Sequence, residues 1–184
     1  MMLRSKIHAT LVVGAVLGFA SSAHADNLAS TPFKIADASR TAPEITGITN
    51  WLNSGPLRIA DLRGKVVLVD FWTHGCINCV RTLPYVTKLH EKYKDRGLVV
   101  IGVHTPEFAF EKSTANVAAA IKRHGIRYPV AQDNDFATWN AYKNVYWPAQ
   151  YIVDKGGKIV FQHAGEGQYD QIERTIEKLL NDNG

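Results

Sequence analysis

An apolar run meets the two cysteines of the chain in the stretch Lys65-Val-Val-Leu-Val-Asp-Phe-Trp-Thr-His-Gly-Cys-Ile-Asn-Cys-Val-Arg-Thr-Leu-Pro84. The start of the stretch is almost entirely apolar and rich in valine, which is typical of a strand buried on both faces of a sheet. Beyond the second cysteine, apolar residues recur in steps of three and four, as in an amphipathic helix. These positions are Val80, Leu83, Val86, Leu89 and Tyr93. The stretch therefore predicts a buried strand that passes within a few residues into a helix ending near Gly97.

The rest of the chain repeats this alternation and then changes character. Its pattern predicts a strand over 98–103, a helix over 111–124, an extended piece over 128–131, a short helix over 133–142, strands over 149–153 and 158–163, and a closing helix that carries Ile172, Ile176, Leu179 and Leu180. The segment Asp154-Lys-Gly-Gly157 is a hairpin signal between the last two strands. The sequence thus predicts an α/β fold in which a central mixed β-sheet carries helices on both faces.

The first 25 residues have the layout of a secretory signal peptide. Arg4 and Lys6 precede an apolar run over 9–20, and small residues follow up to Ala25. This run has about half of the roughly 20 residues that a spanning helix needs, so an uncleaved membrane anchor is the weaker alternative. We expect export to the periplasm and no stable membrane insertion after cleavage. The expected organisation is a signal peptide over 1–25, an extended arm over 26–45 and one domain over 46–184.

The charge balance excludes one class of partner. The chain has 21 Lys and Arg against 17 Asp and Glu, a formal net charge of +4, and the predicted signal peptide contains two of the basic residues. The others are scattered and form no cluster, so we expect no nucleic-acid partner.

Cys76 and Cys79 are the only cysteines, and they are too close together to stabilise the fold as a disulfide. Such a bridge would close a very short loop and remove little entropy from the unfolded chain. The pair follows a strand and opens a helix, where free N–H groups and the helix dipole stabilise a thiolate at Cys76. Cys79 lies one turn later on the same face, within disulfide reach. This predicts a redox-active pair in which Cys76 attacks a disulfide and Cys79 resolves the mixed intermediate.

Other interpretations of the cysteine pair stay open at this point. A zinc site would need two more ligands, and the chain has neither a second cysteine pair nor histidines at zinc-finger spacing. A copper or zinc site that includes His74 and a distant histidine is one alternative, and an inert disulfide is another. We expect no metal and no cofactor.

Several stretches resemble the TlpA/DipZ-like branch of the thioredoxin superfamily. They are Val69-Asp-Phe-Trp-Thr-His-Gly-Cys-Ile-Asn-Cys-Val-Arg-Thr-Leu-Pro-Tyr85, Ala42-Pro-Glu-Ile-Thr-Gly-Ile-Thr-Asn-Trp-Leu-Asn53, Gly102-Val-His-Thr-Pro-Glu-Phe108 and Tyr146-Trp-Pro-Ala-Gln-Tyr151. The resemblance runs from about residue 42 to the C-terminus. It implies a thioredoxin-like domain over 46–184 with thiol-disulfide oxidoreductase activity, similar to the corresponding domain of DipZ-type proteins.

The resemblance also implies roles for single residues. Cys76 and Cys79 match the nucleophilic and resolving cysteines. Pro148 matches a cis-proline that lies against the disulfide, and Trp147 before it presents its backbone to a substrate. Asp70 matches a buried acid that assists proton transfer at the second cysteine, because burial in an apolar strand raises a carboxyl pKa toward neutral pH. A strand-end acid bonded to backbone is the alternative for Asp70.

Four further residues are candidates for supporting roles. Trp72 matches the aromatic position of the superfamily or simply packs in the core, and Pro84 matches a proline that kinks the helix after the cysteines. Glu107 follows the second strand and either assists proton transfer or is a surface acid. His74 is close enough in sequence to tune the Cys76 thiolate.

The residues around the cysteines depart from the thioredoxin pattern in two places. Gly75 stands where thioredoxins have a tryptophan, and Ile77-Asn78 replaces their Gly-Pro. The potentials of such folds span roughly −270 to −120 mV, so the reducing power of thioredoxin cannot be assumed.

The function that we predict is thiol-disulfide exchange with proteins outside the cytoplasm, in the reducing direction that the resemblance implies. Relay of oxidising equivalents through a very stable Cys76 thiolate is the alternative direction. The predicted partners are protein thiols and disulfides, with a membrane electron-transfer protein as the redox partner. One alternative is a redoxin-type thiol peroxidase, because Thr73-His-Gly-Cys76 fits a Thr-x-x-Cys signature, although Val69 stands where a proline is expected. A module that binds copper or an apocytochrome through the same cysteines is the other.

Overall fold

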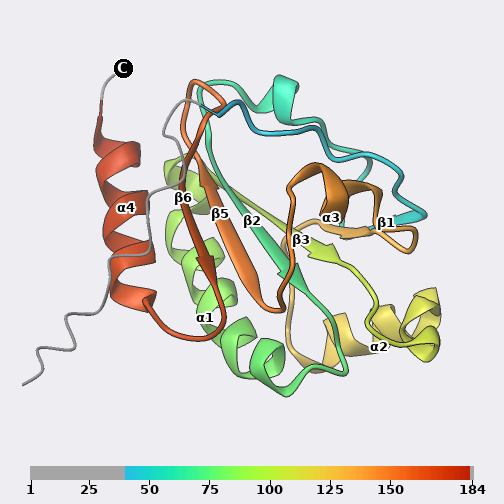
Figure 1. Ribbon diagram of the computed structural model, residues 1–184. Coiled ribbons are helices and arrows are strands. Elements are labelled where there is room, and N and C mark those ends of the chain that lie inside the picture. The colour runs from blue at the N-terminus through green and yellow to red at the C-terminus, as the bar shows by residue number, and fades with distance from the viewer. Residues whose placement is uncertain (1–39, 183–184) are drawn as a thin grey trace, which may run out of the picture. The chain divides into compact units, whose positions relative to one another are not determined.

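The computed structural model describes residues 40–182, so the predicted signal peptide over 1–25 and the arm up to residue 39 lie outside the described residues. Residues 40–182 contain a six-stranded sheet in the order β1-β4-β3-β2-β5-β6 (Figure 1). The strands are β1 (Asn50–Leu52), β2 (Val66–Trp72), β3 (Leu98–His104), β4 (Val130–Gln132), β5 (Ala149–Val153) and β6 (Ile159–Ala164). β2, β3 and β4 run parallel, and the other three pair antiparallel with their neighbours, which confirms the predicted mixed sheet.

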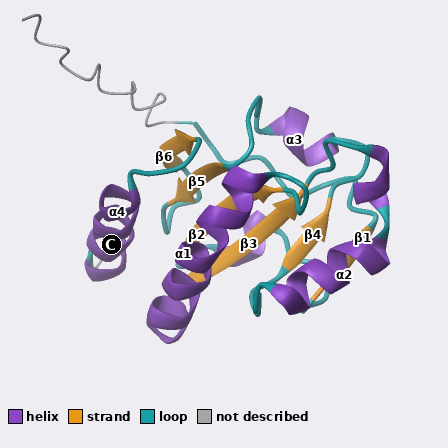
Figure 2. Ribbon diagram, turned by 90° about the horizontal axis from the view of Figure 1, so that it is seen from below, coloured by secondary structure: helices purple, strands orange, loops and turns teal. Residues whose placement is uncertain are grey.

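Helices cover both faces of this sheet, as predicted. They are α1 (Ile77–Tyr93), α2 (Thr114–Arg123), α3 (Ala137–Ala141) and α4 (Tyr169–Asn181). One core cluster contains buried residues of α1, α2 and α4, and the second contains Trp139 of α3 and Ile59 of a 3-10 turn. In Figure 2, α3 lies above the strands, and α1 and α2 lie below them.

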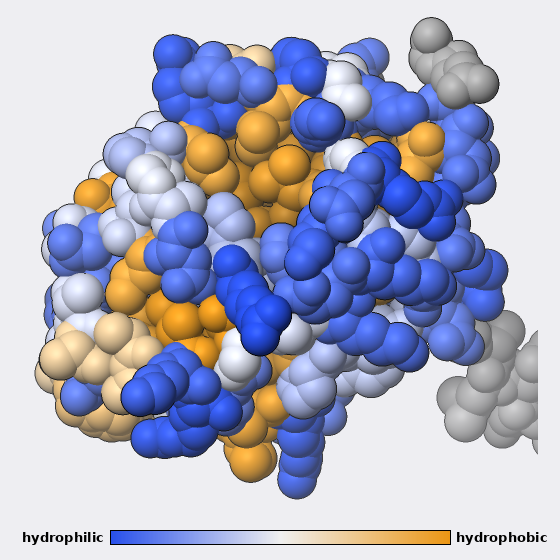
Figure 3. All heavy atoms as spheres, turned by 180° about the vertical axis from the view of Figure 1, so that it is seen from behind, coloured by the Kyte–Doolittle hydropathy of each residue, from blue (hydrophilic) through white to orange (hydrophobic). Residues whose placement is uncertain are grey.

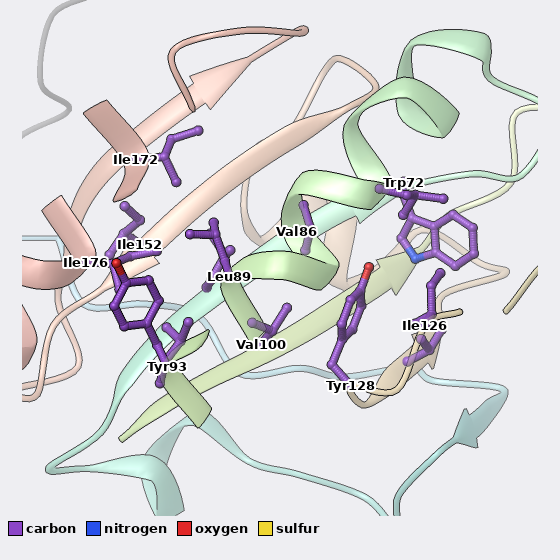
Figure 4. Packing of buried hydrophobic residues seen from close by; sticks show 14 of the residues in the cluster. Trp72, Val86, Leu89, Tyr93, Val100, Ile126, Tyr128, Ile152, Ile172 and Ile176 are labelled. Carbon is purple, nitrogen blue, oxygen red and sulfur yellow. The ribbon is translucent and has the colours of Figure 1, made fainter. Parts of the chain in front are cut away.

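Strand β2 is central because both of its faces are buried. All seven residues of β2 are inaccessible to solvent, and their side chains alternate between the two clusters. Val66 and Leu68 pack toward α1, where Val86, Leu89 and Val100 also gather (Figure 4), whereas Val67 and Val69 pack toward α3. Burial on both faces is the reason why this strand is a continuous apolar run in the sequence.

Helix α1 begins directly after Cys76, as predicted, and ends at Tyr93, four residues before the predicted end near Gly97. Leu83, Val86 and Leu89 face the sheet and are buried, and the helix continues through Pro84. A 3-10 turn over Lys94–Arg96 follows and ends at Gly97, whose φ of 104° lies in the left-handed region that favours glycine. The strand and helix predicted around the cysteines are therefore confirmed.

The predicted helix over 111–124 is wrong at its start. Residues Ala109–Lys112 form a separate 3-10 turn, and α2 begins at Thr114. The Oγ of Ser113 accepts a hydrogen bond from the Asn116 N–H at 3.4 Å and caps α2 there. Glu111 is thus placed outside the helix, which matters for the site.

Two further differences from the prediction concern β1 and α3. β1 was not expected, because its three residues have no strand pattern of their own and are held by pairing with β4. α3 is shorter than the predicted 133–142. The Asp133 carboxylate accepts hydrogen bonds from the N–H groups of Thr138 and Trp139, so residue 133 lies before the first turn of the helix and not within it.

The surface of the described part is mainly hydrophilic, with a few apolar areas. Figure 3 shows one face, on which orange apolar side chains are exposed between blue hydrophilic ones. Among the helices of residues 40–182, none has the length and apolar character that crossing a bilayer requires.

Candidate active site

The two cysteines lie at the junction of β2 and α1, as predicted. Cys76 is the N-cap residue of α1, and its Sγ accepts a hydrogen bond from the Cys79 N–H at 3.3 Å. Both residues are free thiols. Cys76 is partly exposed and Cys79 is fully buried. The first thiol can therefore be reached by a large disulfide, and the second can be reached only through the first.

Burial sets the protonation of Cys79. Removal from solvent is the largest cause that raises the pKa of this thiol, and the hydrogen bond with Cys76 and the charge of Asp70 act in the same direction. A thiol in this position keeps its proton until a base takes it.

Asp70 lies within β2, fully buried, opposite Gln150 of β5. Burial raises the pKa of Asp70 to about 7, although the Gln150 Nε2 donates a hydrogen bond to Oδ1 at 2.8 Å and lowers it. The second polar atom of that amide, Gln150 Oε1, is buried without a partner among the described residues. Asp70 is thus an acid that exchanges a proton near neutral pH and whose charge acts on Cys79.

The Trp147–Pro148 peptide bond is cis, as the resemblance implies. Pro148 precedes β5, whose first residue Ala149 pairs with Phe71 near the end of β2. The bond therefore lies at the same edge of the sheet as the cysteines. The Trp147 Nε1 donates to the Thr105 carbonyl at 3.0 Å, which ties this segment to the end of β3.

Trp72 and Pro84 have structural surroundings. The Trp72 ring is fully buried and lies edge-on to the His104 ring, with 5.0 Å between centroids. Pro84 lies inside α1 with an exposed ring. Trp72 belongs to the same core cluster as Cys79, so it helps to shape the frame around the pair.

Glu107 lies on the loop after β3. Its side chain is exposed, and its N–H donates to the Glu111 Oε2 at 2.7 Å. The Glu111 side chain, which the sequence analysis placed in a helix and gave no role, is fully buried next to the cysteine loop. The one hint in the sequence was that Glu111 is a second acid close to Glu107.

Four donors surround the Glu111 carboxylate. They are the Thr73 Oγ1 and the N–H groups of Gly75 (2.7 Å), Glu107 (2.7 Å) and Phe108 (2.8 Å). Burial opposes ionisation, but these hydrogen bonds together lower the pKa of Glu111. Its charge is therefore held in place by the loop before Cys76 and by the loop after β3.

The position of Glu111 explains Gly75. A Cβ on residue 75 would lie 2.6 Å from the Glu111 Oε1 and 3.4 Å from the Phe110 Cζ. The Thr73 hydroxyl of the Thr-x-x-Cys stretch donates its hydrogen to the same Glu111 carboxylate.

The histidines near the pair are held neutral. Burial lowers the pKa of His74, and it lowers the pKa of His104 to about 4. Their rings stack at 5.4 Å. Within residues 40–182, no group of three or more His, Cys, Asp or Glu side chains is arranged to hold a metal ion.

Comparison with known proteins gives one family and a consistent set of relatives. The pattern of the AhpC/TSA family matches residues 38–162. Protein DipZ of Mycobacterium tuberculosis is 52% identical over 145 residues, which are 77% of this chain and 21% of DipZ. The chain thus spans about a fifth of the length of that relative.

Two matches cover their counterparts almost completely. Thiol-disulfide oxidoreductase YkuV of Bacillus subtilis is 31% identical over 138 residues, 75% of this chain and 93% of YkuV. The crystal structure of the thioredoxin domain of a thiol-disulfide oxidoreductase from Bacteroides vulgatus superposes with a TM-score of 0.64 at 33% identity and covers 78% of this chain and 98% of that domain.

Proposed function

We propose a function from the premise that this chain belongs to the AhpC/TSA family and is a thiol-disulfide oxidoreductase of the thioredoxin fold. It reduces disulfides of proteins outside the cytoplasm, and the residues that do so are Cys76 and Cys79. One observation carries this proposal. Cys76 is a reachable thiol at the N-terminus of a helix, and the buried thiol of Cys79 next to it is influenced by the charge of Asp70, an acid with a pKa of about 7.

The first step is attack by the Cys76 thiolate on a substrate disulfide. A new bond forms between the Cys76 Sγ and one substrate sulfur, the substrate S–S bond breaks, and the second substrate sulfur leaves as a thiolate. The N–H of Cys79 donates to the Cys76 Sγ and holds it at the N-terminus of α1.

The second step resolves the mixed disulfide. Cys79 gives its proton to the Asp70 carboxylate and attacks the Cys76 Sγ, which releases the remaining substrate sulfur. The substrate gains two electrons and the pair becomes a Cys76–Cys79 disulfide. Asp70 suits this role because its pKa of about 7 allows it to accept and return a proton at neutral pH.

The segment Trp147–Pro148 supplies the docking position of the substrate backbone. It lies at the sheet edge that carries Cys76, and the bond from Trp147 to the Thr105 carbonyl holds it there. Trp72 and Pro84 support the fold around the pair, and the exposed side chain of Glu107 favours a surface acid over a proton-transfer role.

The location and the direction of electron flow complete the proposal. The predicted signal peptide over 1–25 directs the thioredoxin-like domain over 46–184 to the periplasm, where a membrane electron-transfer protein reduces the Cys76–Cys79 disulfide after each cycle. The similarity to part of DipZ supports a partner of this kind.

The test is reduction of insulin by dithiothreitol in the presence of the purified protein, with hydrogen peroxide as a second substrate. We expect catalysed insulin reduction and no peroxide turnover. A Cys79→Ser variant expressed as the full chain should accumulate mixed disulfides with periplasmic proteins, and a Cys76→Ser variant is the matched control that should trap none. Absence of trapped partners, or trapping only in the cytoplasm, would contradict the proposal.

A further inference from the structure

The large exposed apolar side chains of residues 40–182 are concentrated around one place. Five of them expose between 53% and 67% of their area, and they are Ile77, Phe108, Phe110, Val145 and Tyr146. Ile77 lies between the two cysteines, Phe108 and Phe110 follow β3, and the last two precede β5. The end of β3 and the start of β5 flank the end of β2 in the sheet, so all three segments meet at the edge that carries Cys76.

The two phenylalanines form one exposed aromatic surface beside the nucleophile. Their rings are stacked, with 5.9 Å between centroids and 6° between planes. The Phe110 Cζ lies 3.4 Å from the place where a Cβ on Gly75 would be, and Gly75 directly precedes Cys76. This aromatic pair, Phe108 with Phe110, therefore lies alongside the residue that attacks the substrate.

The backbone of the aromatic pair is held by hydrogen bonds although its rings are exposed. The N–H of Phe108 donates to the Glu111 carboxylate, which also binds the N–H of Gly75. The Asn116 Nδ2 donates to the Phe110 carbonyl at 3.0 Å. A surface that is ordered before binding loses less entropy when a ligand packs on it.

We propose that the aromatic pair is a specificity-determining contact for a polypeptide substrate that carries an apolar side chain next to its reactive cysteine. The inference rests on the proposed function, because only attack by Cys76 brings a substrate to this edge. The substrate sulfur must come within bonding distance of the Cys76 Sγ, about 2 Å. A neighbouring residue lies only about 3.5 Å further along an extended chain, so its side chain reaches the aromatic pair.

The chemistry of the surface determines the kind of side chain that it binds. Covering exposed phenyl rings with an apolar group lowers the free energy of the complex. The rings carry no charged group and no conventional hydrogen-bonding group for a polar side chain. A small hydrophilic disulfide has no side chain that could reach them. The aromatic pair thus distinguishes substrates by the side chain of the residue next to their reactive cysteine.

The experiment compares rates of reduction by the dithiothreitol-reduced protein. The substrates are two disulfide-linked peptides that differ only in Leu or Ser next to the cysteine, together with bis(2-hydroxyethyl) disulfide. For the unsubstituted protein we expect about a tenfold preference for the Leu peptide, which corresponds to ~1.4 kcal/mol. In Phe110→Ala, the ratio of the Leu-peptide rate to the small-disulfide rate should fall about tenfold. Lys112→Ala, on the same loop and equally exposed, is the matched control and should keep the ratio.

Two outcomes overturn the inference and can be told apart. Equal ratios in the unsubstituted protein and Phe110→Ala, or equal rates for the Leu and Ser peptides, contradict the aromatic contact and leave the proposed function standing. A protein that reduces neither the peptides nor the small disulfide contradicts the proposed function and the inference together.

Discussion

Two buried acids flank the cysteine pair, and they behave in opposite ways. Asp70 in β2 and Glu111 after β3 are both almost inaccessible to solvent. Burial raises the pKa of Asp70 to about 7, whereas the pKa of Glu111 is lowered. The difference is in the donors, because Asp70 receives one hydrogen bond from a side chain and Glu111 receives four.

This comparison shows that burial alone does not determine what an acid does. A buried carboxyl group with few hydrogen-bond donors has a raised pKa, so it can take up or release a proton near neutral pH. With several donors, it is a fixed anion that orders the loops around it. In this molecule the first kind is suited to chemistry and the second to positioning.

The largest expected effect is the loss of the fixed anion. Glu111→Ala leaves the buried Thr73 hydroxyl and three part-buried N–H groups without their acceptor. An unpaired buried donor costs about 1–3 kcal/mol and each other lost hydrogen bond about 1 kcal/mol, so the free energy of unfolding should fall by roughly 4 kcal/mol. Urea denaturation measures this. Glu107→Gln, on the same loop but exposed, is the control and should change the stability by less than about 0.5 kcal/mol. Equal effects of the two substitutions would remove Glu111 from its positioning role.

The pH dependence of stability should separate the two acids. Because folding raises the pKa of Asp70 from 3.8 to about 7, the folded state holds its proton longer, and the free energy of unfolding should drop by up to about 4 kcal/mol as pH rises through this window. The lowered pKa of Glu111 acts oppositely, since its contribution is present above its ordinary value of 4.5 and is lost as pH falls below that value.

Thermal or urea unfolding between pH 3 and 8 tests this separation. Asp70→Asn should flatten the decline between pH 4 and 7 and leave the loss on the acid side in place. A decline that persists unchanged in Asp70→Asn would show that another group causes it.

The rate of the resolving step should depend on Asp70 and much less on its surroundings. Without the carboxylate, Cys79 has no adjacent proton acceptor, so Asp70→Asn should slow resolution of the mixed disulfide by about 100-fold. Rapid quenching and mass spectrometry of the Cys76 adduct measure this rate, and the initial attack by Cys76 in the same experiment is the internal reference. An equal slowing of both steps would point to a general disturbance instead.

A smaller effect is expected from the close contact between Gly75 and Glu111. In Gly75→Ala, the new Cβ meets the Glu111 Oε1 at 2.6 Å, and such overpacking costs about 1–3 kcal/mol. The cost should be much smaller when the same change is made in Glu111→Ala, because the two sites share the contact. Strict additivity in this double-mutant cycle would argue against the contact.

The smallest effect concerns the single donor of Asp70. Gln150→Leu removes the hydrogen bond that lowers the pKa of Asp70, so the pH profile of the resolving step should move to higher pH. The size of this shift should correspond to the loss of one hydrogen bond of about 1 kcal/mol. Gln162→Leu on the neighbouring strand β6 is the matched control. An unchanged profile in Gln150→Leu would mean that this amide does not affect Asp70.

Much of the fold and the centre of the site could be predicted from local patterns. The passage from β2 to α1, the cysteine pair and the hairpin between β5 and β6 each depend on residues close together in the sequence, where periodicity and turn residues carry the information. The resemblance added the cis bond before Pro148 and the burial of Asp70, and the structure contains both.

The remaining features depend on partners far away in the chain. Glu111 lies 36 positions from Gly75, and Gln150 lies 80 positions from Asp70. No local pattern encodes such pairs. The sequence therefore indicated Glu107 as a candidate and predicted a helix that begins at Glu111. The sequence by itself determined that this protein carries a reactive cysteine pair between a buried strand and a helix. Only the tertiary structure decided that Glu111 is buried beside the pair with a lowered pKa, because the pKa of a buried group depends on donors that folding brings to it.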